Sequence, residues 1–174
     1  LPISPKDEVI IPLRQHIGAP CEPIVSVGDY VYMGQKIGES TSFVSAPVHS
    51  SVSGTVKDIK PYPHPTGGMC MSIIIENDHK DTLAEGIKPF TLDLLPDKVK
   101  EYVDSLDPKE IVSKVKEAGI TGMGGASFPL HVKLSPPPGT EIDTVVLNGA
   151  ECEPYLTSDH RAMLEHPKLI ICGA

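Results

Sequence analysis

The sequence predicts an α+β chain, in which an all-β part is followed by the start of a mixed α/β domain. Three observations predict this division. Short apolar runs separated by turn residues fill residues 9–76, a well-marked helix start follows near residue 107, and a glycine-rich loop and one further apolar run come after it. We therefore expect an all-β domain at 1–78, a linker with a short helix at 79–106, and part of an α/β domain at 107–174.

The composition sets limits on the class of protein. Hydrophobic residues make up 40% of the 174 residues, which is enough for a real core, and because aromatics are only 5% that core must be mostly aliphatic. A formal charge of -8 without a basic stripe argues against nucleic acid binding. The apolar runs are far shorter than the roughly 20 residues that span a bilayer, so we expect no direct membrane insertion.

The β part is expected to hold strands at 9–11, 24–27, 52–56 and 73–75, because each is a short apolar run bounded by Gly-Asp, Gly-Gln, Ala-Pro or Gly-Gly turn signals. A weak internal repeat links the segment that begins at Val25 with the one that begins at Ser51. Each presents a strand, a glycine and a polar turn residue, which favours a small sandwich with approximate two-fold symmetry.

The helices have recognisable starts and stops. Within the linker we expect a short helix at 98–103. Asp107 can cap a second helix, Pro108 fits its first position, Glu110 completes a capping box, and Gly119 ends it. One face of that helix is apolar and is expected to pack against a sheet: Ile111, Val112, Val115 and Ala118.

The loop that follows this helix has the composition of a ligand loop. Gly122, Gly124 and Gly125 let the backbone approach a bound group and permit φ > 0, and their N–H groups can point at an anion. Lys133 adds one positive charge. Because the loop follows a helix rather than a strand, it does not fit the dinucleotide fingerprint, and no Gly-Lys-Ser/Thr is present for a P-loop.

A second polar segment completes the candidate site. Residues 144–147 are predicted to form a buried strand that delivers Asn148 and Glu151 at its C-terminal end, where they could hydrogen-bond a polar ring edge or a sugar-like chain. Thr157 or Ser158 can cap a helix that runs through 164 and is broken or restarted at 167. Two readings stay open for Asp159, His160 and Arg161, which are either polar contacts near the site or solvated helix charges. Together the two segments suit a phosphate-bearing cofactor with a flat polar head.

Cysteines and histidines give no sign of a metal site. The four cysteines lie far apart without a Cys-x-x-Cys pair, so we expect reduced, mostly buried thiols and no metal. His16, His49 and His64 are interpreted as surface or loop residues. The proline-rich stretch 61–65 either contacts a partner or is a rigid connector between two strands, and the connector is favoured.

The two polar segments also carry a family resemblance. Gly-x-Gly-Gly-Ala-x-Phe-Pro followed by Asn-x-x-Glu-x-Glu-Pro resembles the FMN site of the NADH-oxidising flavoprotein subunit of respiratory complex I. With the stretches 9–23, 43–49 and 148–161, the chain is more similar to the C subunit of the Rnf ion-translocating ferredoxin:NAD oxidoreductase. Two residues depart from the pattern: Ser127 replaces the third glycine of the loop, and Ala150 replaces an aspartate of the complex I proteins.

This resemblance implies an electron-entry subunit on the cytoplasmic side of the cell membrane, held there by other subunits and linked indirectly to ferredoxin or flavodoxin. It implies FMN as cofactor, NAD(H) as substrate, and 4Fe-4S clusters beyond residue 174, so that the 174 residues alone are expected to be inactive. No side chain need act as acid or base. The residues that would hold FMN are Gly122, Gly124, Gly125, Ala126, Lys133, Asn148, Glu151 and Glu153. Alternatives are a related flavoprotein reductase, acting with a corrinoid protein or a proline reductase, and a non-enzymatic docking module.

The β part resembles a second family, the biotinyl/lipoyl carrier domains, whose fold is a barrel-sandwich hybrid. The resemblance lies in the residues around 27–37, 46–47 and 53–56. Carrier domains present a modified lysine at a hairpin tip, which here corresponds to 41–44, but no lysine occurs between Lys36 and Lys57. We therefore expect the fold without the covalent group.

Overall fold

The computed structural model describes residues 4–88 and 96–174, which form two compact units. The first unit contains residues 4–88 and 112–135, and the second contains 96–111 and 136–174. The glycine-rich loop therefore packs with the β part of the chain. These units divide the chain differently from the boundaries at 78 and 106 that the sequence suggests, and those boundaries stay a prediction.

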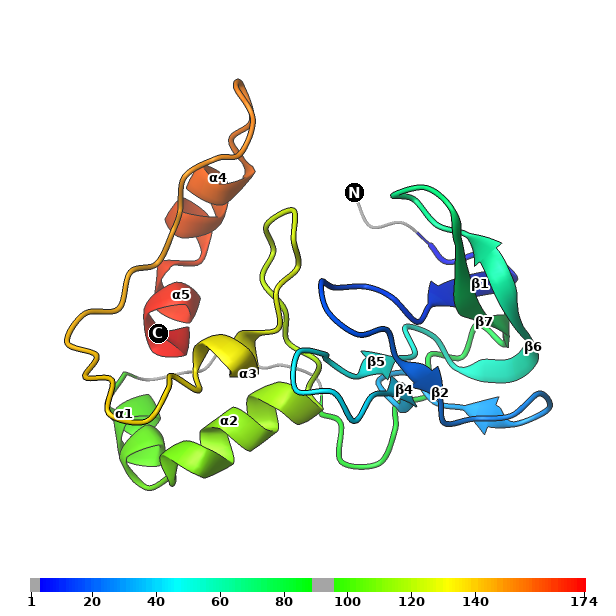
Figure 1. The fold of residues 1–174 in the computed structure, drawn as a ribbon, viewed down its shortest axis with the longest axis horizontal. Helices are drawn as coiled ribbons and strands as arrows, with labels where there is room; N and C mark the ends of the chain where they lie inside the picture. Colours follow the sequence, from blue (N-terminus) through cyan, green and yellow to red (C-terminus); the bar gives the residue numbers. More distant parts are fainter. Residues whose placement is uncertain (1–3, 89–95) are drawn as a thin grey trace. The chain divides into compact units, whose positions relative to one another are not determined.

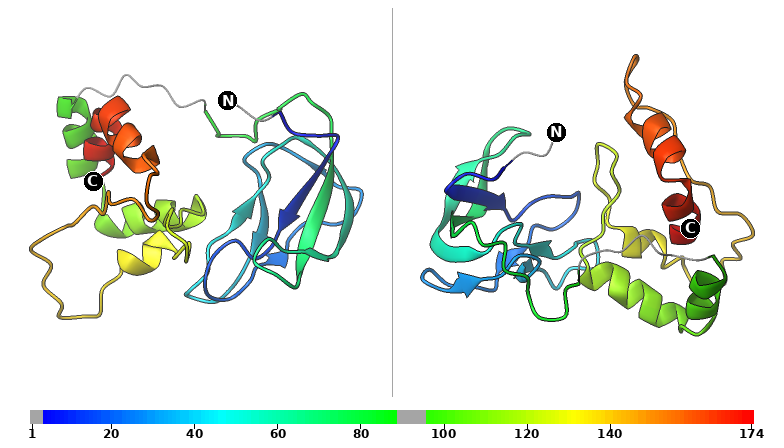
Figure 2. Two further views of the ribbon diagram at one scale, coloured as in Figure 1. Left: turned by 90° about the horizontal axis from the view of Figure 1, so that it is seen from above. Right: turned by 180° about the vertical axis from the view of Figure 1, so that it is seen from behind.

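Seven strands between residues 8 and 77 form two antiparallel sheets in the first unit (Figure 1), which confirms the β prediction for this region. The four-stranded sheet has the order β1 (Glu8–Pro12), β7 (Met69–Asn77), β6 (Gly54–Pro63) and β3 (Tyr30–Val31). The three-stranded sheet has the order β2 (Glu22–Pro23), β4 (Lys36–Glu39) and β5 (Val48–His49). Figure 2 shows the curled strands from two further directions.

The core of this β domain is aliphatic, as the composition predicts. Ile73 and Ile75 on β7 are fully buried, and Ile11 and Val56 reach the same core from the neighbouring strands. Fully burying one such side chain contributes roughly 1.5–3 kcal/mol. The other buried members of the core are Leu13, Cys21, Val31, Ile37, Val48 and Val52.

One predicted strand is wrong. Residues 24–27 form no strand, because Ser26 and Asp29 close a turn there: the Asp29 amide donates to the Ser26 carbonyl (3.1 Å), and the Asp29 carboxylate accepts the Ser26 amide (2.8 Å). The two repeated segments do lie side by side. The Gly28 amide donates to the Val56 carbonyl and the Val56 amide to the Asp29 carbonyl, each at 2.8 Å. The approximate two-fold symmetry itself stays a prediction.

Helix α1 (Pro96–Asp104) confirms the short helix predicted at 98–103, and α2 (Pro108–Glu117) confirms the second. The Asp107 carboxylate accepts the Lys109 amide at 2.9 Å, and Gly119, at φ 66°, ends the helix in the left-handed conformation that glycine tolerates best. Its apolar face is half-buried except for Ala118, which is exposed. The remaining helices are α3 (Leu130–Lys133), α4 (Ser158–Glu165) and α5 (Pro167–Gly173), and the break between the last two at residue 167 is as predicted.

The buried strand predicted at 144–147 is a second error. No strand is formed there, and Val145, Val146 and Leu147 are 73%, 81% and 55% exposed. A strand needs a neighbour to accept its backbone hydrogen bonds, and no segment that the structure describes pairs with these residues. The apolar run alone could not reveal this.

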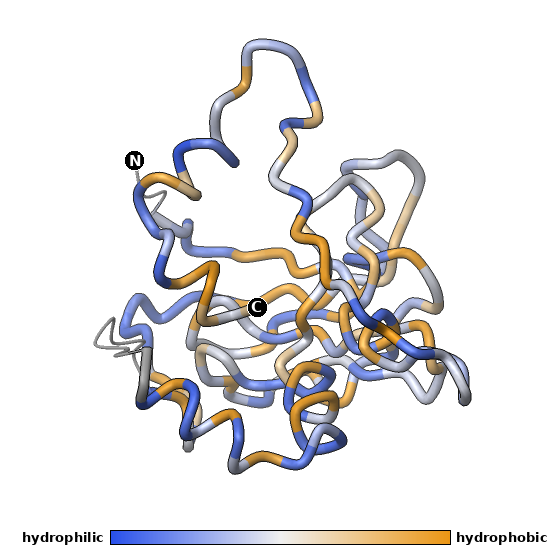
Figure 3. The backbone as a smooth tube through the Cα atoms, turned by 90° about the vertical axis from the view of Figure 1, so that its left-hand side faces the viewer, coloured by the Kyte–Doolittle hydropathy of each residue, from blue (hydrophilic) through white to orange (hydrophobic). Residues whose placement is uncertain are grey.

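Hydrophobic residues are spread along the chain in short stretches (Figure 3). In the part of the chain that the structure describes, no helix has the length and apolar character to cross a membrane.

Candidate cofactor-binding site

The glycine loop is a closed turn between two paired arms. The Gly122 amide donates to the Phe128 carbonyl (2.8 Å), and the Leu130 amide donates to the Ile120 carbonyl (3.0 Å). At the tip, the Ser127 amide donates to the Gly124 carbonyl at 3.0 Å. These bonds hold the arms together and leave residues 123–126 projecting as a short open loop.

Four successive amides of this loop are free. The N–H groups of Met123, Gly124, Gly125 and Ala126 donate no hydrogen bond to any residue that the structure describes. A Cβ atom placed on Gly124 or Gly125 would meet no other atom within 4 Å, so the space in front of the loop is open. We call residues 123–126 the cradle, because free amides around open space are what an anion such as a phosphate needs.

Lys133 supplies a positive charge next to the cradle. Its Nζ lies 3.7 Å from the position that a Cβ atom would take on Gly122, and 5.9 Å from the centroid of the Phe128 ring. Lys133 forms no ion pair with any residue in the described ranges. Its charge is therefore available to a bound anion.

The loop does not use the conformational freedom that its glycines permit. Gly122, Gly124 and Gly125 are not among the residues with positive φ, whereas Ser127 has φ 45°. At Gly124 and Gly125 it is therefore the missing side chain that matters, because it leaves the space in front of the backbone open. Ser127 holds the left-handed conformation, at a cost of roughly 1–2 kcal/mol for a residue with a Cβ.

The second group of predicted residues lies in the other compact unit, so the structure does not bring the two groups into one described site. The Asn148 side-chain oxygen accepts the Ala150 amide at 3.0 Å, and its NH2 group donates to no residue in the described ranges. Both oxygens of Glu151 are engaged at the start of α4, by the His160 amide (3.0 Å) and the Ser158 hydroxyl (3.3 Å). Glu153 is exposed, and its carboxylate has no partner among the described residues.

Glu151 therefore caps helix α4, where the sequence suggested Thr157 or Ser158, and Thr157 makes no side-chain capping bond. A carboxylate at a helix N-terminus satisfies free N–H groups and interacts favourably with the helix dipole.

Asn148 is placed differently: it lines a cavity of about 340 Å³ in the same unit. The other lining residues are Leu147, Gly149, Asp159, Ala162, Met163, Ile170, Gly173 and Ala174. Of the uncertain candidates, Asp159 thus faces a cavity, whereas Arg161 pairs with Glu165.

His131 is a site residue that the sequence did not indicate. It lies on α3, two residues before Lys133, and is 2% exposed. Its Nε2 lies 2.9 Å from the Phe43 carbonyl oxygen of the β domain, and its Nδ1 is buried without a partner in the described part of the chain. The only signal in the sequence was its place in the run that leads to Lys133.

The interpretation of three histidines as surface or loop residues is wrong for His49. His49 lies on β5 and is half-buried, and burial lowers the pKa of its imidazole below the ordinary value. His16 does lie in a loop, between β1 and β2, but it is only 6% exposed: its Nδ1 contacts the Ile17 carbonyl (3.1 Å) and its Nε2 accepts the Ala46 amide (3.0 Å). His64 holds the proline-rich turn between β6 and β7 through the Arg14 carbonyl (2.9 Å), which agrees with a rigid connector.

The cysteines are free thiols, but the expectation that most of them are buried is wrong, because only Cys21 is buried and Cys152 is exposed. Burial raises the pKa of the Cys21 thiol. Over residues 4–88 and 96–174, no group of three or more His, Cys, Asp or Glu side chains could hold a metal ion.

Comparison with known proteins adds two matched regions. Residues 2–80 match the RnfC barrel sandwich hybrid domain, and residues 115–174 match the Nuo51 FMN-binding domain. The fold and site thus define a chain with a barrel-sandwich hybrid domain followed by a region of the FMN-binding type.

Relatives over nearly the whole chain are more specific. The chain is 50% identical over 167 residues to the C subunit of the proton-translocating ferredoxin:NAD(+) oxidoreductase complex of Clostridium ljungdahlii, covering 96% of this chain and 34% of that protein. It is 48% identical over 165 residues to the C subunit of the Na(+)-translocating ferredoxin:NAD(+) oxidoreductase complex of Acetobacterium woodii, covering 95% of this chain and 35% of that protein. It is 40% identical over 166 residues to the C subunit of the ion-translocating oxidoreductase complex of Pseudomonas aeruginosa, covering 94% of this chain and 20% of that protein.

The chain is therefore a relative of the RnfC proteins, the C subunits of ion-translocating ferredoxin:NAD(+) oxidoreductase complexes. It spans about a third of the length of the first two relatives.

Proposed function

We propose that the chain is part of the electron-entry subunit of an ion-translocating ferredoxin:NAD oxidoreductase, peripheral to the cytoplasmic side of the membrane. Two findings support this: similarity to C subunits over 94–96% of the chain, and a free-amide cradle inside the region that matches an FMN-binding domain. The cradle is the observation that carries the proposal, because it is a feature of this chain itself.

The residues present fit the phosphate end of FMN. The four free amides of the cradle and Lys133 would hold the phosphate, and the open space at Gly124 and Gly125 leaves room for the ribityl chain. Asn148, with a free NH2 group on the rim of a cavity, would orient the ring edge. Glu151 would act indirectly by fixing the start of α4, while Glu153 keeps its carboxylate available for a direct contact.

When bound, FMN would supply the exchange of a hydride with NAD(H) and of single electrons with iron-sulfur centres. The protein's part is to bind and orient it, and no side chain is required as acid or base. The 4Fe-4S clusters would lie outside these 174 residues, and contact with ferredoxin or flavodoxin would be indirect. Other subunits of the complex would hold the protein at the membrane.

The test uses a full-length protein that carries this sequence. Apoprotein is titrated with FMN, and NADH-dependent reduction of an artificial acceptor is then measured with and without FMN. We expect saturable FMN binding and activity that depends on it. Absence of FMN binding would favour a docking module, and FMN binding without NADH oxidation would favour a related reductase that uses another donor.

A further inference from the structure

The glycine loop is fastened to the β domain at two points. The Ile17 amide donates to the Ala126 carbonyl at 3.1 Å, and His131 contacts the Phe43 carbonyl at 2.9 Å. Ile17 lies in the connection between β1 and β2, and Phe43 in the connection between β4 and β5. The cradle is therefore held by two connections that are far apart in the sequence.

The two connections are themselves joined. The Ala19 amide donates to the Val44 carbonyl at 3.0 Å, and the buried His16 ring joins both connections, with Nδ1 3.1 Å from the Ile17 carbonyl oxygen and Nε2 accepting the Ala46 amide at 3.0 Å. A side chain on Gly18 is excluded, because its Cβ would lie 2.2 Å from the Val44 carbonyl oxygen. We call residues 16–19 and 43–46 the platform. Its internal bonds make it a fixed base for the loop.

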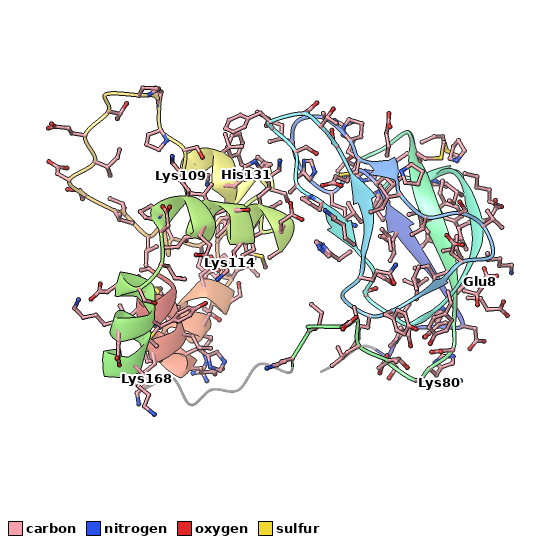
Figure 4. All side chains as sticks on the ribbon, turned by 90° about the horizontal axis from the view of Figure 1, so that it is seen from below. Glu8, Lys80, Lys109, Lys114, His131 and Lys168 are labelled. Atoms are coloured by element: carbon pink, nitrogen blue, oxygen red, sulfur yellow. The ribbon has the colours of Figure 1, made fainter. Side chains whose placement is uncertain are left out.

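The side chain of His131, labelled in Figure 4, links α3 to the platform through the 2.9 Å contact between its Nε2 and the Phe43 carbonyl oxygen. Because a carbonyl oxygen can only accept, this contact requires the hydrogen on Nε2, and in that tautomer Nδ1 is a bare acceptor. The Phe43 ring meets the imidazole edge-on, with centroids 5.7 Å apart and planes at 87°.

Stability alone does not account for a histidine at this position. Its Nδ1 is buried with no donor among the described residues, and an unpaired buried acceptor is destabilising. An apolar side chain of similar size would avoid that cost. An apolar side chain could not donate a hydrogen bond to the Phe43 carbonyl. A donor such as histidine can, and this bond fixes α3 against the carbonyl.

Fixing α3 also fixes the cradle. The bonds between Leu130 and Ile120 and between Phe128 and Gly122 close the loop just before His131, and Lys133 follows two residues later. Any shift of α3 would move Lys133 relative to the four free amides. A binding loop that spends less time in its competent arrangement binds its ligand more weakly by the same factor.

We propose that the platform of the barrel-sandwich domain positions the cradle for the phosphate of FMN, and that His131 is the positioning residue between them. The connection at 41–44, which corresponds to the lysine-bearing tip of carrier domains, offers a backbone carbonyl to a second segment of the chain instead. This inference rests on the proposed FMN function and assigns a role in it to the β domain.

Three substitutions in the full-length protein test the inference, with FMN affinity of the apoprotein and its thermal unfolding measured side by side. His131→Leu should raise the Kd for FMN about tenfold, as expected when the competent arrangement falls to about a tenth of the population, and should leave Tm unchanged or higher. His131→Gln keeps a donor for the Phe43 carbonyl and should bind nearly as the unsubstituted protein does. Phe43→Leu removes the ring contact but keeps the carbonyl, so it should lower Tm without changing the Kd.

The outcomes separate this inference from the proposed function. FMN binding by His131→Leu at the unsubstituted affinity, equal losses in the Leu and Gln variants, or failure of the Leu variant to fold would each overturn the positioning role alone. Absence of FMN binding in the unsubstituted protein would overturn both.

Discussion

Gly119 offers the sharpest test of how the end of α2 fits the β domain. It has φ 66°, and a Cβ atom added there would lie 2.5 Å from the Pro47 carbonyl oxygen and 3.1 Å from the His49 ring. The left-handed conformation costs a residue with a Cβ roughly 1–2 kcal/mol, and forcing an extra carbon into a packed contact costs roughly 1–3 kcal/mol. Gly119→Ala should therefore lower the free energy of unfolding by about 2–5 kcal/mol.

The measurement is urea unfolding of the 174-residue chain, followed by far-ultraviolet circular dichroism. Gly124→Ala is the matched control, because its Cβ would meet no atom within 4 Å and its φ is not positive, so its effect should stay within about 0.5 kcal/mol. An unfolding midpoint for Gly119→Ala equal to that of the control would refute the described packing at Pro47.

Three further predictions concern the loop, pH and cofactor retention. Ser127→Gly should raise the free energy of unfolding by about 0.5–1 kcal/mol, since glycine relieves the left-handed strain at φ 45° but gains freedom when unfolded; a loss of stability in urea would contradict this. Burial lowers the pKa of His49 below 6.5, so the unfolded chain binds more protons and stability should fall as pH drops from 7 through 6.5. His49→Gln should weaken that dependence in thermal unfolding at matched pH values, and an unchanged slope would exclude His49 as a source. Finally, the 174-residue chain should purify with little flavin, because it spans about a third of the length of its relatives and tight binding depends on a complete, preorganised site; stoichiometric, non-exchanging FMN in its absorbance spectrum would show that these residues suffice.

Local signals predicted the elements that depend on local chemistry. Helix α2 follows from Asp107, Pro108 and Gly119, each of which acts within one turn of the helix, and the aliphatic β strands follow from their short apolar runs. The two strand errors have different causes: at 24–27 a local turn between Ser26 and Asp29 was missed, whereas at 144–147 the cause is non-local. Residues 144–147 have the right composition for a strand, but pairing depends on a partner that sequence patterning cannot supply.

The candidate site could likewise be predicted only where local composition indicates it. Glycine composition and Lys133 pointed to the loop, but only the structure shows that the four cradle amides donate to no described residue and that Ser127, not a glycine, holds the left-handed position. For Glu151 the sequence pattern suggested a direct contact with a cofactor, but the structure shows both of its carboxylate oxygens engaged at the start of α4. His131 could not be found from the sequence, because its partner at Phe43 is 88 residues away.

The central claim is that the cradle binds the phosphate end of FMN, and fluorescence titration of the full-length apoprotein with FMN tests it most directly. Gly125→Val should fold normally, since a Cβ there meets no atom within 4 Å, but its side chain would fill the space that the ligand needs and abolish FMN binding. Ala118→Val, at an exposed position outside the loop, is the matched control and should bind normally. Lys133→Ala should weaken binding by about 1.5–3 kcal/mol, the usual contribution of one charge-assisted hydrogen bond. Unchanged affinity in the folded Gly125→Val protein would show that the loop is only a structural turn.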